Sequence, residues 1–270
     1  MSRAQERPEG TVSVDGQKKV AIVTGAARGL GKSIALALLE AGYRIVASDV
    51  ARSLPESLRA PAGTGPLVHA VTDLADPGTG HELVELALAT FGRCDAVVNN
   101  AGVGGPGVEL SATTDAQLAA VLEINLLGAA RLCREAIPHL RRSGQGRIIN
   151  IGSLFADHPA PDGAAYSMSK AALAALSRCI AVEEGRHGIT ANTVAPGYML
   201  TEMHEEEAAM QAQRQGVPIE EYMAQLRSTV PLQRHGTGCD VAGAVLWLLS
   251  DGAAYVSGQT IPVNGGLVLS

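Results

Sequence analysis

Short apolar runs rich in β-branched residues recur along the chain, and a longer segment of helical character separates most of them. Continuous runs of this kind are typical of parallel strands that are buried on both faces. Seven strands are predicted, at residues 19–24, 43–48, 67–71, 95–98, 147–151, 189–195 and 259–263. Helices are predicted at residues 32–40, 77–91, 114–142, 164–184 and 239–249. The alternation indicates an α/β fold, a Rossmann-type doubly wound parallel sheet of about seven strands with helices on both faces.

A single domain is expected over residues 18–270, because no repeat or break in composition interrupts this pattern. Residues 1–17 lack the apolar stretch of a signal peptide, and we expect a flexible lead-in there. Residues 198–230 differ in character, since they are rich in Glu, Gln and Met. One or two surface helices are predicted in this segment, where they would form a mobile lid.

Three glycines, Gly25, Gly29 and Gly31, lie between the first predicted strand and the helix that follows it. With 31 glycines in 270 residues, this spacing arises by chance about 0.4 times per chain, so the pattern alone is weak. Its position adds weight, because glycines allow a tight turn there and the N-terminus of the helix can bind a pyrophosphate. The sequence therefore predicts a dinucleotide-binding loop.

Asp49 ends the second predicted strand, 18 residues after Gly31, near the usual distance for an acid that binds an adenosine ribose. Its carboxylate would accept hydrogen bonds from both ribose hydroxyls and would repel a 2′-phosphate, which favours NAD over NADP. Arg28, in the glycine loop, favours NADP instead, because a basic side chain can pair with that phosphate. A solvated strand end or a helix cap is the alternative interpretation of Asp49.

Ser153, Tyr166 and Lys170 are predicted to meet in space. Ser153 follows a predicted strand, and Tyr166 and Lys170 lie one turn apart on one face of a helix. An ammonium beside a phenol lowers the pKa of the phenol from about 10 toward neutrality. Such a tyrosine exchanges a proton with a carbonyl or alcohol oxygen, which the serine hydroxyl can also bind. With 5 Tyr and 4 Lys in 270 residues, the Tyr–Lys spacing arises by chance about 0.07 times per chain.

Polar residues elsewhere have weaker signals. Asn125 lies inside a predicted apolar helix and must find a hydrogen-bond partner, for which a structural bond to the backbone is the simplest choice. Asn99 and Asn100 follow the fourth predicted strand, at the edge of the sheet where ligands bind in such folds. Taken alone, these two asparagines are explained by turn chemistry.

Composition excludes several classes of function. The net charge of −6 does not indicate the excess of basic residues that nucleic-acid binding requires. No run of 18 apolar residues predicts a membrane span. The four cysteines are widely spaced, with no C-x-x-C pair and no pattern of metal ligands, so no metal is expected and a reducing cytoplasm fits.

Six of these features together resemble the short-chain dehydrogenase/reductase family, over about Val20 to Val268. In the family's order, they are Thr24-Gly25-x-x-x-Gly29-x-Gly31, Asn99-Asn100-Ala101-Gly102, Asn125, Ser153, Tyr166-x-x-x-Lys170 and Pro196-Gly197. The resemblance implies a Rossmann fold and hydride transfer between a nicotinamide and a secondary alcohol or ketone. It also implies a homotetramer that pairs through the helices bearing Asn125 and Tyr166.

The resemblance assigns a role to each matching residue. Tyr166 would be the general acid/base, and Ser153 would orient the substrate oxygen. Lys170 would lower the pKa of Tyr166 and hold the nicotinamide ribose, while Asn125 would anchor a water that relays protons toward Lys170. The implied cofactor-binding residues are Gly25, Arg28, Gly29, Leu30, Gly31, Asp49, Asp73, Leu74, Asn100, Ala101, Gly102, Tyr166, Lys170, Pro196, Gly197 and Thr201. In this family, an acid at the position of Asp49 usually goes with NAD.

The substrate pocket is expected to draw on Leu154, Phe155, His158, Tyr198 and the lid segment. His158 would be either a second proton carrier or a surface residue. We therefore expect a cytoplasmic, NAD-dependent oxidoreductase that acts on a small secondary alcohol, polyol or ketone, with no nucleic-acid or membrane partner. The alternatives are an NADPH-dependent reductase of 3-oxoacyl thioesters on acyl-carrier protein and a dinucleotide sensor without turnover.

Overall fold

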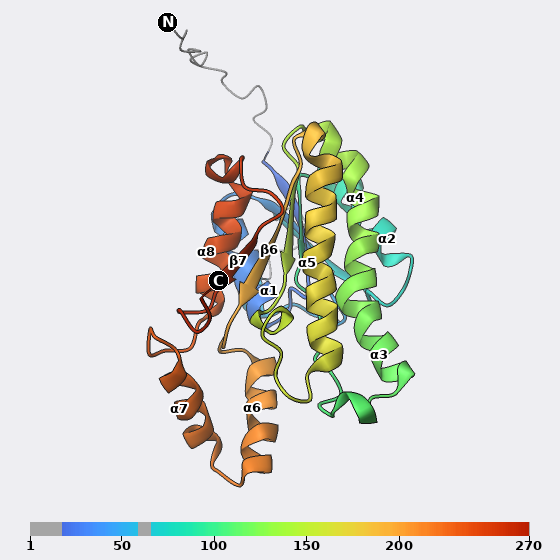
Figure 1. Cartoon of the computed structure of the whole chain (residues 1–270). Coiled ribbons are helices and arrows are strands. Elements are labelled where there is room, and N and C mark those ends of the chain that lie inside the picture. Colours follow the sequence, from blue (N-terminus) through green and yellow to red (C-terminus); the bar gives the residue numbers. More distant parts are fainter. Residues whose placement is uncertain (1–17, 59–65, 270) are drawn as a thin grey trace, which may run out of the picture.

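The computed structural model of the protein describes residues 18–58 and 66–269 (Figure 1). Its parallel strands pair into one sheet in the order β3-β2-β1-β4-β5-β6-β7. The strands are β1 (Val20–Thr24), β2 (Arg44–Asp49), β3 (Leu67–Val71), β4 (Ala96–Asn99), β5 (Arg147–Ile151), β6 (Thr190–Pro196) and β7 (Thr260–Val263). The prediction of a Rossmann-type parallel sheet is confirmed. The expected lead-in, residues 1–17, lies outside the described residues.

Helices cover both faces of the sheet (Figure 1). On one face α1 packs against α8, and on the other face α2, α4 and α5 lie side by side, with an apolar cluster beneath each layer. These helices are α1 (Gly29–Glu40), α2 (Thr79–Phe91), α4 (Ala129–Ser143), α5 (Ala164–Glu184) and α8 (Gly238–Leu249). Every residue of β1, β4 and β5 is buried, which explains their unbroken apolar runs. Short 3-10 turns lie at η1 (Glu56–Leu58), η2 (Leu110–Ala112), η4 (Leu154–Ala156), η5 (Gly185–His187) and η6 (Asp251–Ala253).

The strand order reverses between β1 and β4, and this reversal positions the site. In open parallel sheets, ligands bind at such a switch point, outside the carboxyl ends of the strands. The loops that follow β1, β4, β5 and β6 therefore meet at one edge, which is the lower edge in Figure 1.

The long helix predicted at residues 114–142 is divided by a wider turn. It consists of α3 (Asp115–Leu122), the π-helical turn η3 (Glu123–Gly128) and α4. A π turn inside an α-helix is rare and is frequent at functional sites, and this one carries Asn125. Hydrophobic periodicity does not reveal the turn, because one additional residue only shifts the phase of the pattern.

By length and composition alone, the helical stretch Asp115–Ser143 is apolar enough to cross a membrane. Its most apolar window has a mean hydropathy of 1.3, and 33% of that window is buried within the chain. A single such helix is weak evidence for a membrane protein, because core helices pass the same test. The stretch also contains an ion pair between Glu123 and Arg131.

Two helices, α6 (Glu202–Gln215) and α7 (Ile219–Thr229), form a hairpin that projects beyond the carboxyl edge of the sheet (Figure 1). We call residues 198–230 the lid segment. One or two helices were expected in this segment and the structure has two, while the role of the segment as a mobile lid stays a prediction.

Ion pairs join the lid segment to the rest of the domain. Arg28, beside the glycine loop, lies 3.7 Å from Glu206 on α6. Arg214, near the other end of α6, lies 2.9 Å from Asp162 and also donates a hydrogen bond to the carbonyl oxygen of Gly107 at 2.7 Å. The lid segment thus contacts loops on both sides of the carboxyl edge.

Candidate active site

The side chains of Ser153, Tyr166 and Lys170 come together just beyond the end of β5. The Ser153 hydroxyl faces the phenol of Tyr166 and lowers its pKa. Lys170 Nζ donates a hydrogen bond to the carbonyl oxygen of Ile151 at 2.8 Å and lies 5.7 Å from the centroid of the Tyr166 ring. A pair of hydroxyls backed by a buried ammonium is an arrangement suited to proton transfer.

Burial controls the electrostatics of this group. It raises the pKa of Tyr166, and the carboxylate of Glu207 adds to the rise, while the Ser153 hydroxyl opposes it. Burial also lowers the pKa of Lys170 to about 8. The expectation that Lys170 holds the pKa of Tyr166 below its ordinary value is wrong for this structure. The ammonium is directed at the carbonyl oxygen of Ile151 rather than at the phenol oxygen, so desolvation of the phenolate prevails.

Asn125 holds the loop after β4 in place opposite Lys170. Its Nδ2 donates to the carbonyl oxygen of Val103 at 2.9 Å and to the Ser169 hydroxyl at 3.0 Å, and its Oδ1 accepts from the Val103 amide at 2.8 Å. A Cβ on Gly102 would lie 3.1 Å from Asn125 Oδ1 and 3.4 Å from Lys170 Nζ. The structural bond to the backbone is therefore present, and the water relay stays a prediction.

The glycine loop is closed so tightly that no side chain fits at Gly31. A Cβ there would lie 2.0 Å from the carbonyl oxygen of Gly25 and 2.5 Å from Nδ2 of Asn100. Gly25 itself has a φ of +65°, in the left-handed region that favours glycine. The bare backbone at the start of α1 is a cradle that fits the pyrophosphate of a dinucleotide.

Thr24 and Asn100 fasten this loop to the end of β4. Asn100 Nδ2 donates to the carbonyl oxygens of Thr24 at 2.9 Å and Gly25 at 3.1 Å. The Thr24 hydroxyl accepts from the backbone amides of Asn100 and Ala101, both at 3.1 Å. Thr24 belongs to the glycine motif but is absent from the predicted site residues, and its place before Gly25 was the available signal.

Asp49 braces the glycine loop from the next strand. Its Oδ2 accepts from the Ala27 amide at 2.8 Å and its Oδ1 from the Ala51 amide at 3.0 Å. A carboxylate has about four lone-pair sites, so capacity for ribose hydroxyls remains. Arg28 extends toward Glu206 on α6. The predicted NAD-selecting acid therefore lies at the loop itself.

Asp73 was predicted to contact adenine, and Leu74 and Leu30 were predicted to bind the cofactor. Asp73 Oδ1 accepts from the Ala75 amide at 2.9 Å, which fixes the turn after β3. Leu74 is buried, and a Cβ added to Gly128 would lie 2.8 Å from the Leu74 Cβ. Leu30 packs on the apolar cluster beneath α1. The contact of these three residues with the cofactor stays a prediction.

The residues predicted for the nicotinamide side join β6 to α6. Pro196 ends β6, and the Gly197 amide donates to the carbonyl oxygen of Val263 at 2.9 Å. Thr201 caps α6, and a Cβ on Gly29 would lie 3.6 Å from Thr201 Cγ2. The start of the lid segment therefore lies directly across from the glycine loop.

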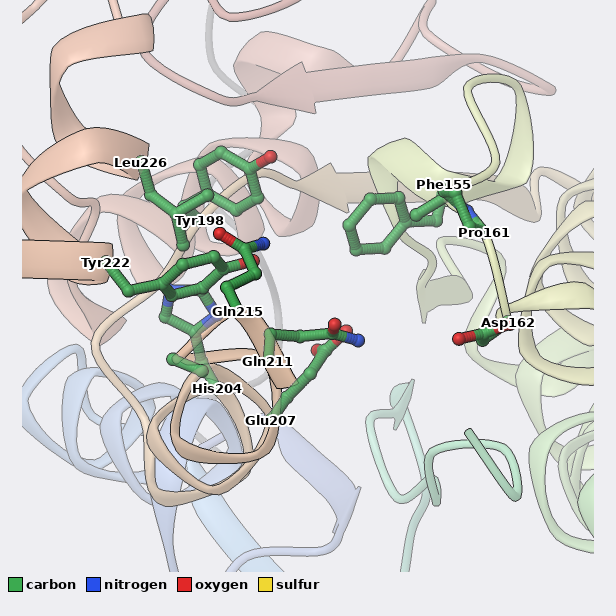
Figure 2. A pocket seen from close by; sticks show the side chains of 12 residues that line it. Phe155, Pro161, Asp162, Tyr198, His204, Glu207, Gln211, Gln215, Tyr222 and Leu226 are labelled. Atoms are coloured by element: carbon green, nitrogen blue, oxygen red, sulfur yellow. The ribbon is translucent and has the colours of Figure 1, made fainter. Parts of the chain in front are cut away.

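A cavity of about 240 Å³ opens between the lid segment and residues 155–162 (Figure 2). Of the predicted pocket residues, Phe155 and Tyr198 line it, Leu154 is buried, and His158 is exposed and outside the lining. The other lining residues are Ala160, Pro161, Asp162, His204, Glu207, Ala208, Gln211, Gln215, Tyr222 and Leu226.

Sequence reasoning did not single out Glu207, Gln211 or Gln215. Their spacing of four residues was the available signal, because it gives α6 a polar stripe on one face. A charged surface helix shows several such stripes, however, and only the tertiary packing shows which one lines a cavity.

Comparison with known proteins decides the family. A family model described as enoyl-(acyl carrier protein) reductase matches residues 25–268. L-fucose dehydrogenase from Oryctolagus cuniculus is 36% identical over 255 residues, which cover 93% of this chain and 85% of that protein. A 3-oxoacyl-(acyl-carrier-protein) reductase from Staphylococcus aureus is 32% identical over 256 residues, covering 93% and 98%. The chain belongs to the short-chain dehydrogenase/reductase family.

A solved structure of levodione reductase matches this short-chain dehydrogenase/reductase with a TM-score of 0.84 at 29% identity, covering 93% of this chain and 97% of that one. The predicted family is therefore confirmed, and so is the prediction of an enzyme. The enzyme is an oxidoreductase of a family that uses NAD(P).

Proposed function

We propose that this short-chain dehydrogenase/reductase interconverts a small secondary alcohol or polyol and the corresponding ketone, with NAD as cofactor. The observation that carries the proposal is the grouping of the Tyr166 and Ser153 hydroxyls beside the buried Lys170 ammonium. When bound, a nicotinamide supplies the hydride acceptor or donor. The bare backbone around Gly25 and Gly31 is what a dinucleotide requires.

Each member of the trio has a distinct task in this proposal. In reduction, the carbonyl oxygen accepts hydrogen bonds from both hydroxyls, and Tyr166 transfers its proton to that oxygen while the carbon gains a hydride. The phenolate left behind is stabilised by the Ser153 hydroxyl, which lowers the pKa of Tyr166. In oxidation, the phenolate takes the proton of the alcohol. Lys170 has three donors and Ile151 uses one, so the others are free to bind a ribose hydroxyl.

NAD is proposed rather than NADP because of the charges around the glycine loop. The Asp49 carboxylate is held at the loop by the amide of Ala27 and would repel a phosphate on the ribose. Arg28, the residue that would pair with such a phosphate, is 3.7 Å from Glu206. The anionic partner weakens the case for Arg28 as a phosphate ligand.

An NADPH-dependent reductase of 3-oxoacyl thioesters is the second candidate. It is supported by the relative with that activity in its name, at 32% identity, and by Arg28. The polyol assignment is supported by the relative named L-fucose dehydrogenase, at 36% identity, and by the polar side chains of the cavity.

Steady-state rates with four cofactors distinguish these candidates. We expect oxidation of secondary alcohols or polyols with NAD, ketone reduction with NADH, and much lower rates with NADP and NADPH. A strong preference for NADPH, together with reduction of a 3-oxoacyl thioester, would replace our proposal with the second candidate. NAD binding without hydride transfer to any member of a broad carbonyl panel would favour a non-catalytic sensor.

We also propose a homotetramer that pairs through the helices bearing Asn125 and Tyr166. Leu127 on η3 and Met168 on α5 support it, because these apolar side chains are 42% and 43% exposed. Light scattering should then give a mass near four times 27.8 kDa. A monomer at micromolar concentration would contradict the proposal.

A further inference from the structure

We infer that Glu207 on α6 selects substrates that carry additional hydroxyl groups and no negative charge. The inference rests on the proposed function and deepens it in two respects. It narrows the substrate class to uncharged polyols or sugars, and it names the residue that recognises them.

The cavity that Glu207 lines adjoins the proposed catalytic serine, because Phe155 also lines it and the Phe155 amide donates a hydrogen bond to the Ser153 hydroxyl at 3.1 Å. Burial raises the pKa of Tyr166, Tyr198 and Tyr222, and the Glu207 carboxylate adds to each rise by disfavouring the phenolate. Figure 2 shows the end groups of Glu207 and Gln211 close together, directed into the cavity toward Asp162 and the wall formed by Phe155. A substrate whose oxygen is bound by Ser153 and Tyr166 can therefore place its other groups in the adjoining cavity, which Glu207 lines.

Glu207 has no counter-ion among the residues that the structure describes. The two nearby arginines are engaged elsewhere, since Arg28 pairs with Glu206 and Arg214 pairs with Asp162. One side of Glu207 is open to solvent, and the protein atoms around its other side raise the pKa of its carboxyl. A carboxylate only accepts hydrogen bonds, so a ligand that fits here must donate them.

The other side chains that line the cavity favour hydroxyl groups over other hydrogen-bond donors. The amides of Gln211 and Gln215 both donate and accept, as a hydroxyl does and an ammonium does not. Phe155 and Tyr198 add flat apolar surfaces, with ring centroids 6.5 Å apart. Tyr198 is held by stacking on His204 at 5.6 Å. Such a lining suits a ring with apolar C–H faces and several hydroxyls on its edge.

Charge and size argue against other substrates. A carboxylate or phosphate on the substrate would lie near the unpaired Glu207, and the two negative charges would repel each other. The cavity of about 240 Å³ is also below the range of about 300–1,000 Å³ that is typical of sites for drug-sized ligands. Both features favour a small neutral molecule.

Four six-membered-ring substrates, matched in shape, test the inference with NAD as cofactor. The first is cyclohexanol, and the second is the best member of a panel of hexoses, deoxyhexoses and inositols. The third is 3-hydroxycyclohexanecarboxylate, which adds a negative charge, and the fourth is 4-aminocyclohexanol, which adds a positive one. The variants are Glu207→Leu, Glu207→Gln and, as a control on the same helix, Glu205→Leu, where the residue is exposed and outside the cavity lining.

We expect Glu207→Leu to raise the KM of the polyol between about tenfold and a hundredfold, through loss of hydrogen bonds to a charged acceptor. The ratio of kcat/KM for the polyol to that for cyclohexanol should fall by a similar factor, because any effect of the lost charge on Tyr166 is common to both substrates. Glu207→Gln keeps a hydrogen-bond acceptor and loses the charge. It should therefore raise the KM of the polyol less than Glu207→Leu does, and it should lower the KM of the anionic substrate. Glu205→Leu should change none of these values.

An unchanged polyol KM in both Glu207 variants would overturn the inference, as would a wild-type preference for the anionic or the ammonium substrate. Those outcomes leave the proposed function intact so long as cyclohexanol is oxidised. If no alcohol is oxidised, the proposed function fails, and thermal shift decides the inference separately. A polyol-induced rise in Tm in the presence of NAD that disappears in Glu207→Leu supports recognition by Glu207, and no rise in the wild type overturns it.

Discussion

Lys170 donates a hydrogen bond from Nζ to the carbonyl oxygen of Ile151, at 2.8 Å, and so joins α5 to the last residue of β5. In the described part of the chain, this ammonium has no carboxylate partner, and burial lowers its pKa to about 8. A buried charge held only by a neutral acceptor is unfavourable for stability. Perturbed groups of this kind cluster at functional sites, which agrees with the role proposed for Lys170.

The first prediction concerns stability against pH. The pKa of Lys170 is about 8 in the folded chain against an ordinary 10.5, so the folded state binds fewer protons than the unfolded state between these values. Stability therefore rises with pH in this window. Relative to Lys170→Met, the wild type should gain up to about 3 kcal/mol of unfolding free energy between pH 7 and pH 10.5. Urea unfolding of both proteins at the two pH values measures this gain, and a constant difference between them would contradict it.

The second prediction separates the roles of Tyr166 and Lys170. Tyr166→Phe keeps the ring and removes the proton that is transferred, so kcat should fall by about 10²- to 10⁴-fold. The Kd for NAD, measured by calorimetry, should stay within about twofold. Lys170→Ala should impair both quantities, because it removes the ammonium and the donor assigned to the ribose. Equal losses in the two variants would contradict this division.

The third prediction concerns cofactor choice. Asp49→Ala removes the charge that repels a 2′-phosphate, so the ratio of kcat/KM for NAD to that for NADP should fall by at least about tenfold. Arg28→Ala is the matched control, and it should leave NAD kinetics nearly unchanged because Arg28 pairs with Glu206. Because Asp49 also accepts from the amides of Ala27 and Ala51, circular dichroism must confirm folding of the variant. A ratio that Asp49→Ala does not alter would argue against NAD selection by this acid.

The fourth prediction concerns the glycine loop. A Cβ at position 31 would lie 2.0 Å from the carbonyl oxygen of Gly25, so Gly31→Ala should destabilise the chain by several kcal/mol and abolish binding of the cofactor. Gly243→Ala is the control, because nothing lies within 4 Å of a Cβ at that exposed position in α8. The control should be neutral or stabilising by up to about 1 kcal/mol. Thermal unfolding and calorimetry with NAD compare the two variants, and similar behaviour would show that the loop opens freely.

The fifth prediction concerns the lid segment. Arg214 is about half exposed, so Arg214→Ala should cost less than about 1 kcal/mol of stability. It also removes the contacts to Asp162 and Gly107, so α6 should close less often over the cavity and the substrate KM should rise by about three- to tenfold. Arg227→Ala on α7, an exposed residue outside the cavity lining, is the control. A KM that stays constant in Arg214→Ala would argue against closure by this contact.

The strands of the sheet could be predicted from the sequence, because parallel strands buried on both faces are continuous apolar runs. β1 was predicted at residues 19–24 and lies at Val20–Thr24, and β5 was placed at its observed bounds, Arg147–Ile151. The π turn at Glu123–Gly128 could not be predicted from the sequence, because its one additional residue leaves the helical pattern of apolar residues recognisable on both sides.

The proposed site also has features that the sequence predicts and features that it does not. The spacing of Tyr166 and Lys170 is local to one helix, so sequence alone brings them together. The direction of the pKa shift of Tyr166 depends first on burial of the phenol and then on Glu207, which comes from a different helix. Both are tertiary relationships, and a single sequence contains no periodic signal for either of them.

The π turn has a consequence for how this chain tolerates changes in length. A π turn holds one residue more than the α-helical turn in its place, so deletion of one residue between Glu123 and Gly128 would convert the stretch to regular α-helix and move its side chains relative to their neighbours. The Asn125 amide would then swing away from Val103, and the loop after β4 would lose its anchor. Insertions or deletions of one residue, which a surface turn tolerates, should therefore disrupt the site when they fall within residues 123–128.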